Sequence, residues 1–163
     1  MYYLNCFFIY SIIGYIAELI FGLVIGADVK SGILYGPWTF IYGFAAIIII
    51  LISDKCFKKL HMNKILETVI IFIILLFSLM TLELLGGYLI EIIFGYSFWN
   101  YTDFKFNVGK YTCFEMGLVW SVISILFIYI VRPLFDKFIL KIPKWLTFVI
   151  GFFFILDVIT TFI

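Results

Sequence analysis

The sequence is short of charge. Of its 163 residues only 13% are Asp, Glu, Lys or Arg, while 66% are hydrophobic, and the mean hydropathy is +1.23. A soluble domain is about a quarter charged and roughly half apolar, so this chain has more apolar side chains than one core can bury. The excess must face lipid, and we predict an all-α polytopic membrane protein with a single transmembrane domain over residues 1–163.

Histidine and cysteine are also scarce. The one histidine is His61, and the three cysteines, Cys6, Cys56 and Cys113, are widely separated and form no C-x-x-C pair. These counts argue against a zinc site and against a disulfide framework. We therefore expect no metal and no cofactor, and we expect His61 to be solvated in a basic loop.

The motifs of several enzyme classes are missing as well. No G-x-x-x-x-G-K-[ST] is present, so the chain has no Walker motif for ATP, and any ATPase must be a separate subunit. No H-E-x-x-H, G-x-S-x-G or Ser/His/Asp set can be read, so we name no catalytic residue. The net charge of +1 argues against a nucleic-acid partner.

Long apolar stretches are abundant. A hydrocarbon core of about 30 Å needs roughly 20 helical residues, and the second stretch is short for this. It can cross only if the preceding segment dips into the membrane or the bilayer thins locally. The first stretch lacks a charged n-region and a small-residue cleavage site, so we take it as a retained span. The predicted spans are 3–26, 38–53, 66–93, 113–132 and 145–163.

The basic residues are divided unequally between the loops. Segments 54–65 and 132–144 hold four each of the 11 lysines and arginines, and Lys30, Lys105 and Lys110 lie on the other side. The positive-inside rule places the two basic segments in the cytoplasm. We expect a bacterial inner-membrane protein with a cytoplasmic N-terminus, an external C-terminus and an external loop over 94–112.

Acidic residues fall inside these spans, where Arg132, at one end, is the sole base. An acid at the bilayer centre costs about 2.5–3.5 kcal/mol on insertion scales. Each carboxylate must therefore be protonated, hydrogen-bonded, or matched by a cation, a ligand or a partner chain. All lie toward the expected external face, which predicts an acidic cup open to the outside. They are Glu18, Glu83, Glu91, Glu115 and Asp157.

A simpler interpretation exists for three of these acids. Glu91 and Glu115 can be interfacial residues in contact with water, and Asp157 can serve a structural role or contact a partner.

Glycines accompany the deeper acids. Small residues at every fourth position form one helical stripe and let helices approach closely, so we expect Glu18 to point into a helix contact. Gly86 and Gly87 lie between Glu83 and Glu91, and we expect them to allow close helix packing in the same way. The predicted packing positions are Gly14, Gly22, Gly26, Gly86 and Gly87.

The stretch "SGILYGPWTFIYG", residues 31–43, interrupts the apolar pattern. Gly36 and Pro37 end a helix, because proline lacks an N–H and disfavours α geometry at the preceding residue. Non-helical backbone at membrane depth must be covered by protein or a water-filled cavity, so we expect a re-entrant or broken segment whose freed polar groups face a cavity. The residues assigned to this break are Gly36, Pro37, Tyr42 and Gly43. The alternative is an ordinary loop followed by a helix with proline in its first turn.

Two stretches resemble the signatures of the bacterial ABC-transporter type IV permease family. "SGILYGPWTFIYGFAA" is similar to its G-x-L-x-G-P-x-x-x-I-Y-G pattern, and "LELLGGYLIEIIFGYSFWNYTDFKFNVGKYTCFEMGLVW" to its second signature. The chain departs from the family pattern at Asn100 and Thr102. The resemblance covers roughly residues 10–130 and implies a membrane transport component without indicating a substrate. The matching residues of the second signature are Glu83, Gly87, Trp99, Tyr101, Asn107, Gly109 and Trp120.

These observations predict a permease component that binds a small polar or cationic solute. Aromatic faces beside carboxylates suit amines and quaternary ammonium groups, although the aromatic loop can also be a packed lid or an interfacial anchor. Five spans make a small transporter, so a homo-oligomer or partner subunits are expected. The predicted binding residues are Glu18, Glu83, Glu91, Glu115, Trp99, Tyr101, Asn107 and Trp120.

Two other functions stay open at this point. One is a small intramembrane enzyme acting on a lipid or isoprenoid head group, with the carboxylates as acid–base groups or metal ligands. The other is a non-catalytic assembly or sensing subunit.

Overall fold

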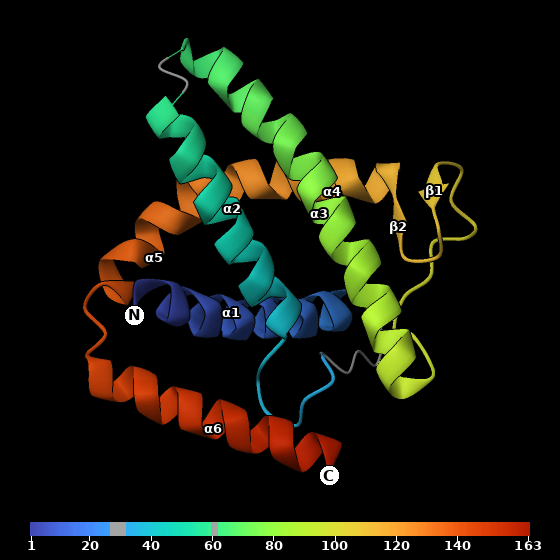
Figure 1. Cartoon of the computed structure of the whole chain (residues 1–163), viewed down its shortest axis with the longest axis vertical. Helices are drawn as coiled ribbons and strands as arrows, with labels where there is room; N and C mark the ends of the chain where they lie inside the picture. Colours follow the sequence, from blue (N-terminus) through green and yellow to red (C-terminus); the bar gives the residue numbers. More distant parts are fainter. Residues whose placement is uncertain (27–31, 60–61) are drawn as a thin grey trace. The chain divides into compact units, whose positions relative to one another are not determined.

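The computed structural model describes residues 1–26, 32–59 and 62–163, and the expectations for Lys30, Ser31 and His61 lie outside these ranges. The protein is predominantly helical, with one small hairpin of two strands (Figure 1). In chain order the elements are α1 (Tyr2–Ile25), α2 (Phe40–Lys59), α3 (Lys64–Phe94), β1 (Asn107–Val108), β2 (Thr112–Cys113), α4 (Phe114–Leu126), the π-helix η1 (Phe127–Val131), α5 (Arg132–Ile139) and α6 (Lys144–Phe162).

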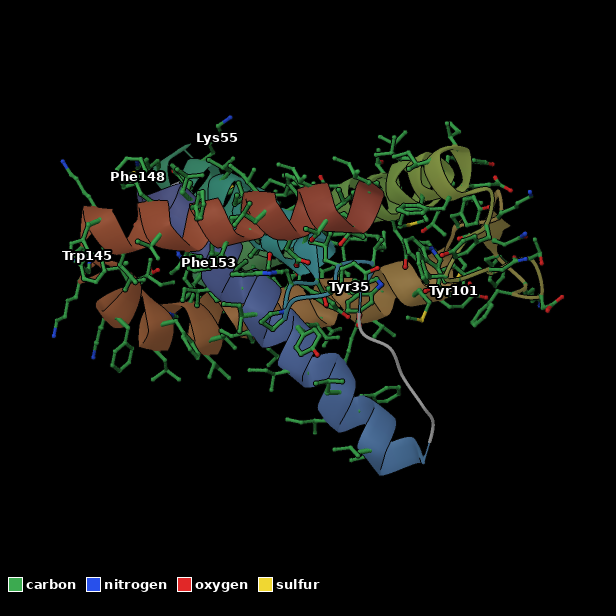
Figure 2. The ribbon with its side chains drawn as sticks, turned by 90° about the horizontal axis from the view of Figure 1, so that it is seen from below. Tyr35, Lys55, Tyr101, Trp145, Phe148 and Phe153 are labelled. Carbon is green, nitrogen blue, oxygen red and sulfur yellow. The ribbon has the colours of Figure 1, made fainter. Side chains whose placement is uncertain are left out.

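The all-α polytopic fold is confirmed. Among the described residues, five helical segments are long and apolar enough to cross a membrane: α1, α2, α3, α4 together with η1 and α5, and α6. Apolar side chains on these helices point outward. Trp145, Phe148 and Phe153 on α6, for example, are 65%, 67% and 59% exposed (Figure 2). Exposed apolar surface of this kind is stable where lipid replaces water.

The helix ends follow local signals in the sequence. Asn63 caps α3, since its side-chain oxygen accepts a hydrogen bond from the N–H of Ile65 at 3.1 Å. Gly95 ends the same helix with φ 74°, a left-handed conformation that glycine adopts without a steric penalty. Gly26 ends α1 in the same way, with φ 66°.

Two predicted loops are corrected. The second span does not stop at residue 53, because α2 continues through Asp54 to Lys59 and is 20 residues long. Similarly, residues 132–139 form α5 instead of a loop. Charged residues at the end of a membrane helix can lie in the interface, where they remain helical and solvated. The charged residues in these two segments therefore did not indicate where each helix ends.

A π-helix interrupts the fourth span at Phe127–Val131. Pro133 lies two residues after the end of the π-helix and has no N–H for the carbonyl of Tyr129, four residues earlier, while its ring crowds that carbonyl. A local widening of the helix relieves this conflict, as π-turns within α-helices commonly do.

The chain forms two compact units. The first comprises residues 1–47 and 134–163, and the second comprises 48–133. In the first unit, α1 contacts α6, and Phe7, Phe8, Leu34 and Trp38 form a buried cluster. The expectation of one transmembrane domain stays a prediction.

A buried polar pair also joins α1 and α6. The hydroxyl of Thr147 donates to the side-chain oxygen of Asn5 at 2.6 Å, and both residues are buried. Hydrogen bonding offsets the cost of placing these groups in an apolar environment.

In the second unit, α3 packs mainly against α4, and β2 contacts both helices (Figure 1). Gly117 on α4 permits close packing, because a Cβ there would come within 2.7 Å of the side chain of Met80 on α3. The strands are antiparallel, with Asn107 opposite Cys113 and Val108 opposite Thr112. We did not predict this hairpin from the sequence, and it lies within the segment expected to be an external loop.

Candidate functional site

A buried carboxylate in the second unit is held by three neutral donors. Glu83, on α3, is 8% exposed. Its Oε1 accepts hydrogen bonds from the hydroxyl of Tyr101 at 3.0 Å and from the indole N–H of Trp120 at 3.3 Å. Its Oε2 accepts from the hydroxyl of Thr112 at 2.9 Å. We call Glu83 and these three donors the Glu83 cluster.

The four residues come from four segments of the chain. Glu83 lies in α3, Trp120 in α4 and Thr112 in β2. Tyr101, labelled in Figure 2, lies in the loop between α3 and the hairpin. The backbone N–H of Tyr101 donates to the carbonyl of Lys110 at 2.8 Å, which fixes the loop against the hairpin. The cluster therefore ties the loop and hairpin to the packed pair of α3 and α4.

Gly87, one turn beyond Glu83 on α3, lets the hairpin approach the helix. A Cβ at this position would lie about 2.3 Å from the ring of Tyr111, which is buried. The carbonyl of Tyr111 in turn accepts a hydrogen bond from the indole of Trp99 at 2.9 Å. Trp99 thus stabilises the fold of the loop, and the predicted packing role of Gly87 has a specific partner in Tyr111.

The hairpin turn depends on Gly109 and Asn107. Gly109 has φ 68°, a left-handed conformation, and the side-chain amide of Asn107 donates to its carbonyl at 3.3 Å. Asn107 is exposed and shapes this turn, although the sequence placed it among the binding residues. Both residues belong to the family signature, and both shape this turn.

Burial and the charge of Glu83 raise the pKa values of Tyr101 and Cys113. Burial raises the pKa of the Tyr101 phenol strongly, and the negative charge of Glu83 raises it further, because a phenolate beside a carboxylate is unfavourable. Burial likewise raises the pKa of the Cys113 thiol, and Glu115 and Glu83 add to this effect. Both groups therefore stay protonated and neutral at physiological pH.

Glu91 has a basic partner, contrary to the expectation that the acids lack one. The ammonium of Lys110 lies 2.9 Å from its Oε1, and the two side chains are 53% and 35% exposed. A hydrogen bond to Glu91 raises the pKa of Lys110. The hairpin turn supplies this lysine to α3 from 19 positions away, which residue spacing could not indicate.

Glu115 is the first-turn acid of α4. Its Oε1 accepts a hydrogen bond from the backbone N–H of Phe106 at 3.2 Å. Its Oε2 is buried and has no hydrogen-bond partner within the part of the chain that the structure describes. The carboxylate therefore stabilises the backbone just before β1 through one oxygen, and its other oxygen has no hydrogen bond to a described residue.

The segment around Gly36 and Pro37 is braced by an acid from the far end of the chain. Residues 32–37 form bends, and α2 begins at Phe40, so this segment is not helical. The N–H groups of Tyr35 and Gly36 donate to the two carboxylate oxygens of Asp157 at 3.1 and 2.9 Å. These two N–H groups thus bind Asp157, whereas a cavity beside the segment and entry of the segment into the membrane stay predictions.

Close packing continues from this segment into α2. Tyr42 and Gly43, which we assigned to the break, lie inside α2. The ring of Tyr42 occupies the space beside Gly14, and Gly43 faces Ser11 on α1. Gly14 therefore lies against the side chain of Tyr42 on α2, whereas a Cβ at Gly26 would meet no described atom within 4 Å.

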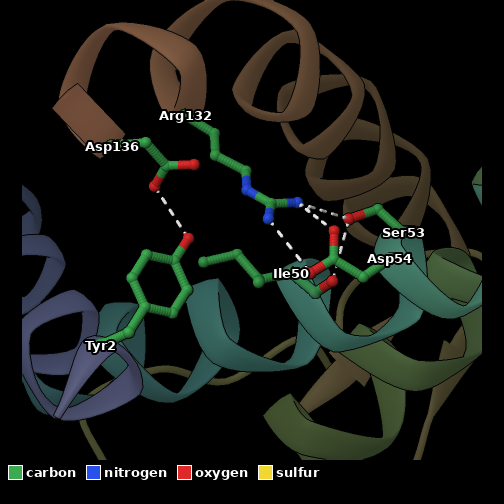
Figure 3. A network of polar contacts seen from close by, with 6 residues as sticks. All are labelled: Tyr2, Ile50, Ser53, Asp54, Arg132 and Asp136. Atoms are coloured by element: carbon green, nitrogen blue, oxygen red, sulfur yellow. Dashed lines mark hydrogen bonds and ion pairs between the residues drawn. The ribbon is translucent and has the colours of Figure 1, made fainter. Parts of the chain in front are cut away.

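Arg132 forms an ion pair in the second unit. Its guanidinium donates to both carboxylate oxygens of Asp54, at 2.7 and 3.1 Å, and to the hydroxyl of Ser53 at 3.3 Å (Figure 3). In the first unit, the hydroxyl of Tyr2 donates to Asp136 at 2.8 Å (Figure 3). The sequence identified Arg132 as a span-end base but did not identify its partner.

The predicted binding residues are brought together only in part. Glu83, Tyr101 and Trp120 meet directly, whereas Glu18 belongs to the first unit. Sequence reasoning missed Thr112 and Tyr111. Thr112 stands three residues before Glu115, a spacing typical of a helix cap, but Cys113 caps α4 and Thr112 binds Glu83. Over the residues described, no three His, Cys, Asp or Glu side chains gather as metal ligands.

Comparisons with known proteins gave one result. A family model described as "Putative ABC-transporter type IV" matches residues 5–162. No curated protein and no solved structure matches the chain.

Proposed function

The chain belongs to the ABC-transporter type IV family, and we propose that it is a permease component that binds a small polar or cationic solute at the Glu83 cluster. The observation that carries this proposal is the chemistry around the carboxylate. Tyr101, Thr112 and Trp120 are neutral donors, so they stabilise the charge of Glu83 without neutralising it. A carboxylate of this kind attracts a proton or an ammonium group.

The aromatic surroundings favour an organic cation. The rings of Tyr101 and Trp120 adjoin the carboxylate, and Phe104 contacts Tyr101 edge to face at 5.3 Å between centroids. Aromatic faces attract ammonium and quaternary ammonium groups. An arriving cation would replace the Tyr101 hydroxyl on Oε1, and the loop over 95–113 would act as the cover of the site.

The finer architecture of the transporter is part of the same proposal. Glu91 and Glu115, in the same unit as Glu83, would add negative charge on the external side, with the N-terminus in the cytoplasm of a bacterial cell. Because the sequence has no Walker motif, a separate ATPase subunit would supply the energy, and a second copy of the chain would complete the pathway. External labelling of cysteines introduced at 103–108, but not of native Cys56, tests this orientation in intact cells.

Substitution of Glu83 tests the site. The purified protein in detergent would be titrated with tetramethylammonium chloride, with sodium chloride as ionic-strength control, and tryptophan fluorescence would be followed. We expect a saturable change in the wild type that Glu83→Gln removes, because glutamine keeps the size and loses the charge. Asp103→Asn, which removes an exposed carboxylate of the same loop, serves as matched control and should respond like the wild type.

Two outcomes would overturn the proposal. One is an equal response of the wild type and Glu83→Gln. The other is loss of folding in Glu83→Gln by circular dichroism, which would show that the charge of Glu83 serves only to hold the loop in place.

A further inference from the structure

A groove runs along the second unit between α3 and the α4–η1 segment. It consists of two adjoining hollows that share Thr68 and Val69. The first hollow begins at the N-terminus of α3, and the second continues one to two turns further along the helix. We call them together the α3–η1 groove. Its lining residues are Lys64, Ile65, Thr68, Val69, Phe72, Val122, Ile125, Leu126 and Tyr129.

One end of the groove is basic and polar. The ammonium of Lys64 lies 5.5 Å from the centroid of the Tyr129 ring, and the Tyr129 hydroxyl is 2.7 Å from that of Thr68. Thr68 donates to the carbonyl of Lys64 at 2.8 Å, so its oxygen is the acceptor for Tyr129. These contacts hold the ring under the ammonium, and the exposed ammonium keeps donors for an anion.

The other end of the groove is apolar. Phe72, Ile125 and Leu126 line it together with the two valines, and Val69, Val122 and Leu126 remain 47%, 52% and 51% exposed. From Lys64 to Phe72 the helix rises by about 12 Å at 1.5 Å per residue. One leaflet of the hydrocarbon core is about 15 Å thick, so the groove extends from the interface almost to the middle of the bilayer.

The π-helix η1 supplies Tyr129 to the basic end of the groove. Tyr129 lies within η1 and reaches Thr68 on α3, and Phe57 of α2 meets the same ring at 6.3 Å between centroids. The wider turn at η1 thus presents an aromatic side chain to the start of α3. Lys55 and Lys58, at the end of α2 in the same unit, are also exposed and add positive charge.

We propose that the α3–η1 groove binds one anionic phospholipid, with its phosphate on Lys64 and an acyl chain along the apolar end. Basic pockets between transmembrane helices recognise anionic head groups. The order of the chemistry along the groove, a cation at the interface and then apolar side chains toward the bilayer centre, matches the order along a phospholipid. The groove is continuous with the lipid-facing surface of α3 and α4 and is separate from the Glu83 cluster.

Native mass spectrometry of the detergent-purified chain tests this proposal. Dioleoyl-phosphatidylglycerol and dioleoyl-phosphatidylcholine would be added in equal amounts, and retained lipid would be counted. We expect one phosphatidylglycerol to be retained in preference. Lys64→Gln should lower this preference about fivefold, the effect of one lysine at an anionic surface. Lys105→Gln removes an exposed lysine that lies outside the groove, in the loop after α3, and it should leave the preference unchanged.

Further variants and a competitor distinguish binding of the lipid head group from binding of the acyl chain. Val122→Trp would fill the apolar end and should reduce retention of phosphatidylglycerol while folding is preserved by circular dichroism. Phe77→Trp, an exposed position on α3 outside the groove, is the control for added bulk. Glycerophosphoglycerol, which has no acyl chains, should not compete. Equal retention of both lipids, unchanged preference in Lys64→Gln, or full competition by glycerophosphoglycerol would each overturn the proposal.

Discussion

The backbone N–H of Gly36 donates to a carboxylate oxygen of Asp157 at 2.9 Å, across 121 positions of the chain. Gly36 also has to be a glycine here, because a Cβ would come within about 2.4 Å of the Trp38 indole and 2.7 Å of that carboxylate. The Gly-Pro break and the acid of α6 are therefore two halves of one contact. This contact explains why an apolar chain interrupts its backbone at this point and carries an aspartate in its last helix.

Substitution of Asp157 should destabilise the protein. In Asp157→Ala, the N–H groups of Tyr35 and Gly36 lose their acceptor. The Tyr35 contact is exposed and the Gly36 contact is part-buried, so we expect a loss at the low end of the about 1–3 kcal/mol that a buried unsatisfied donor costs. Asp157→Asn keeps one acceptor oxygen but turns an N–H₂ donor toward the other N–H, so we expect a smaller loss. Thermal unfolding in detergent measures both variants. Asp103→Asn is the control at an exposed position, and equal melting temperatures of all three variants would contradict the prediction.

Gly87→Ala should lower the melting temperature. The new Cβ would clash with the ring of buried Tyr111, and overpacking of this kind costs about 1–3 kcal/mol. Gly151→Ala on α6 is the matched control, because its Cβ would lie 3.6 Å from Phe8, an ordinary contact. Alanine favours a helix over glycine by about 0.5–1 kcal/mol, so the control should be neutral or stabilising. A stabilising effect of Gly87→Ala would show that the hairpin does not pack on α3.

The loop over 95–113 should open at alkaline pH. Folding raises the pKa of Tyr101, Lys110 and Tyr111, the first through burial and the charge of Glu83. A group with a raised pKa stabilises the fold fully below its unfolded pKa, about 10 for tyrosine and 10.4 for lysine, and loses this contribution as the pH rises through the folded pKa. Stability should therefore be constant near neutral pH and fall above about pH 10.

Tyrosinate absorbance near 295 nm tests this pH dependence in a titration of the folded protein. We expect Tyr101 and Tyr111 to ionise later than the other tyrosines, and Tyr101→Phe should remove part of this late transition. Tyr96→Phe, which removes an exposed tyrosine of the same loop, should leave that transition in place. Ionisation of all tyrosines in one step near pH 10 would show that Tyr101 is not held beside a carboxylate.

Cys113 should report on opening of the Glu83 cluster. Its side chain is buried, and its raised pKa keeps it as the unreactive thiol near pH 7. In a Cys6→Ala, Cys56→Ala background we expect slow reaction with maleimide. Glu83→Ala leaves three donors without an acceptor and should raise the rate about tenfold, since each orphaned donor costs about 1–3 kcal/mol. Lys105→Gln in the same loop is the control, and equal rates in all variants would contradict the coupling of Cys113 to the cluster.

Part of the candidate site was predictable because some signals are local. Glu83 is an acid within an apolar span, and the energetic cost of that position indicates a polar partner or a function. Tyr101 and Trp120 were named from the family signature, and they do contact Glu83. Thr112 and Tyr111 were not identified, because their roles follow from the hairpin that turns at Gly109 and brings them onto α3.

Hydropathy by itself determined the membrane class and the five spans, because the bilayer demands a length of apolar helix that is visible in the residues. The Gly36–Pro37 pair likewise predicted non-helical backbone through preferences that act within a few residues. Only the tertiary structure decided that Asp157 binds the break, that Lys110 reaches Glu91, and that Asp54 pairs with Arg132. Each of these contacts joins residues 19 to 121 positions apart, and their pairing is set by how helices and loops pack, which no local spacing encodes.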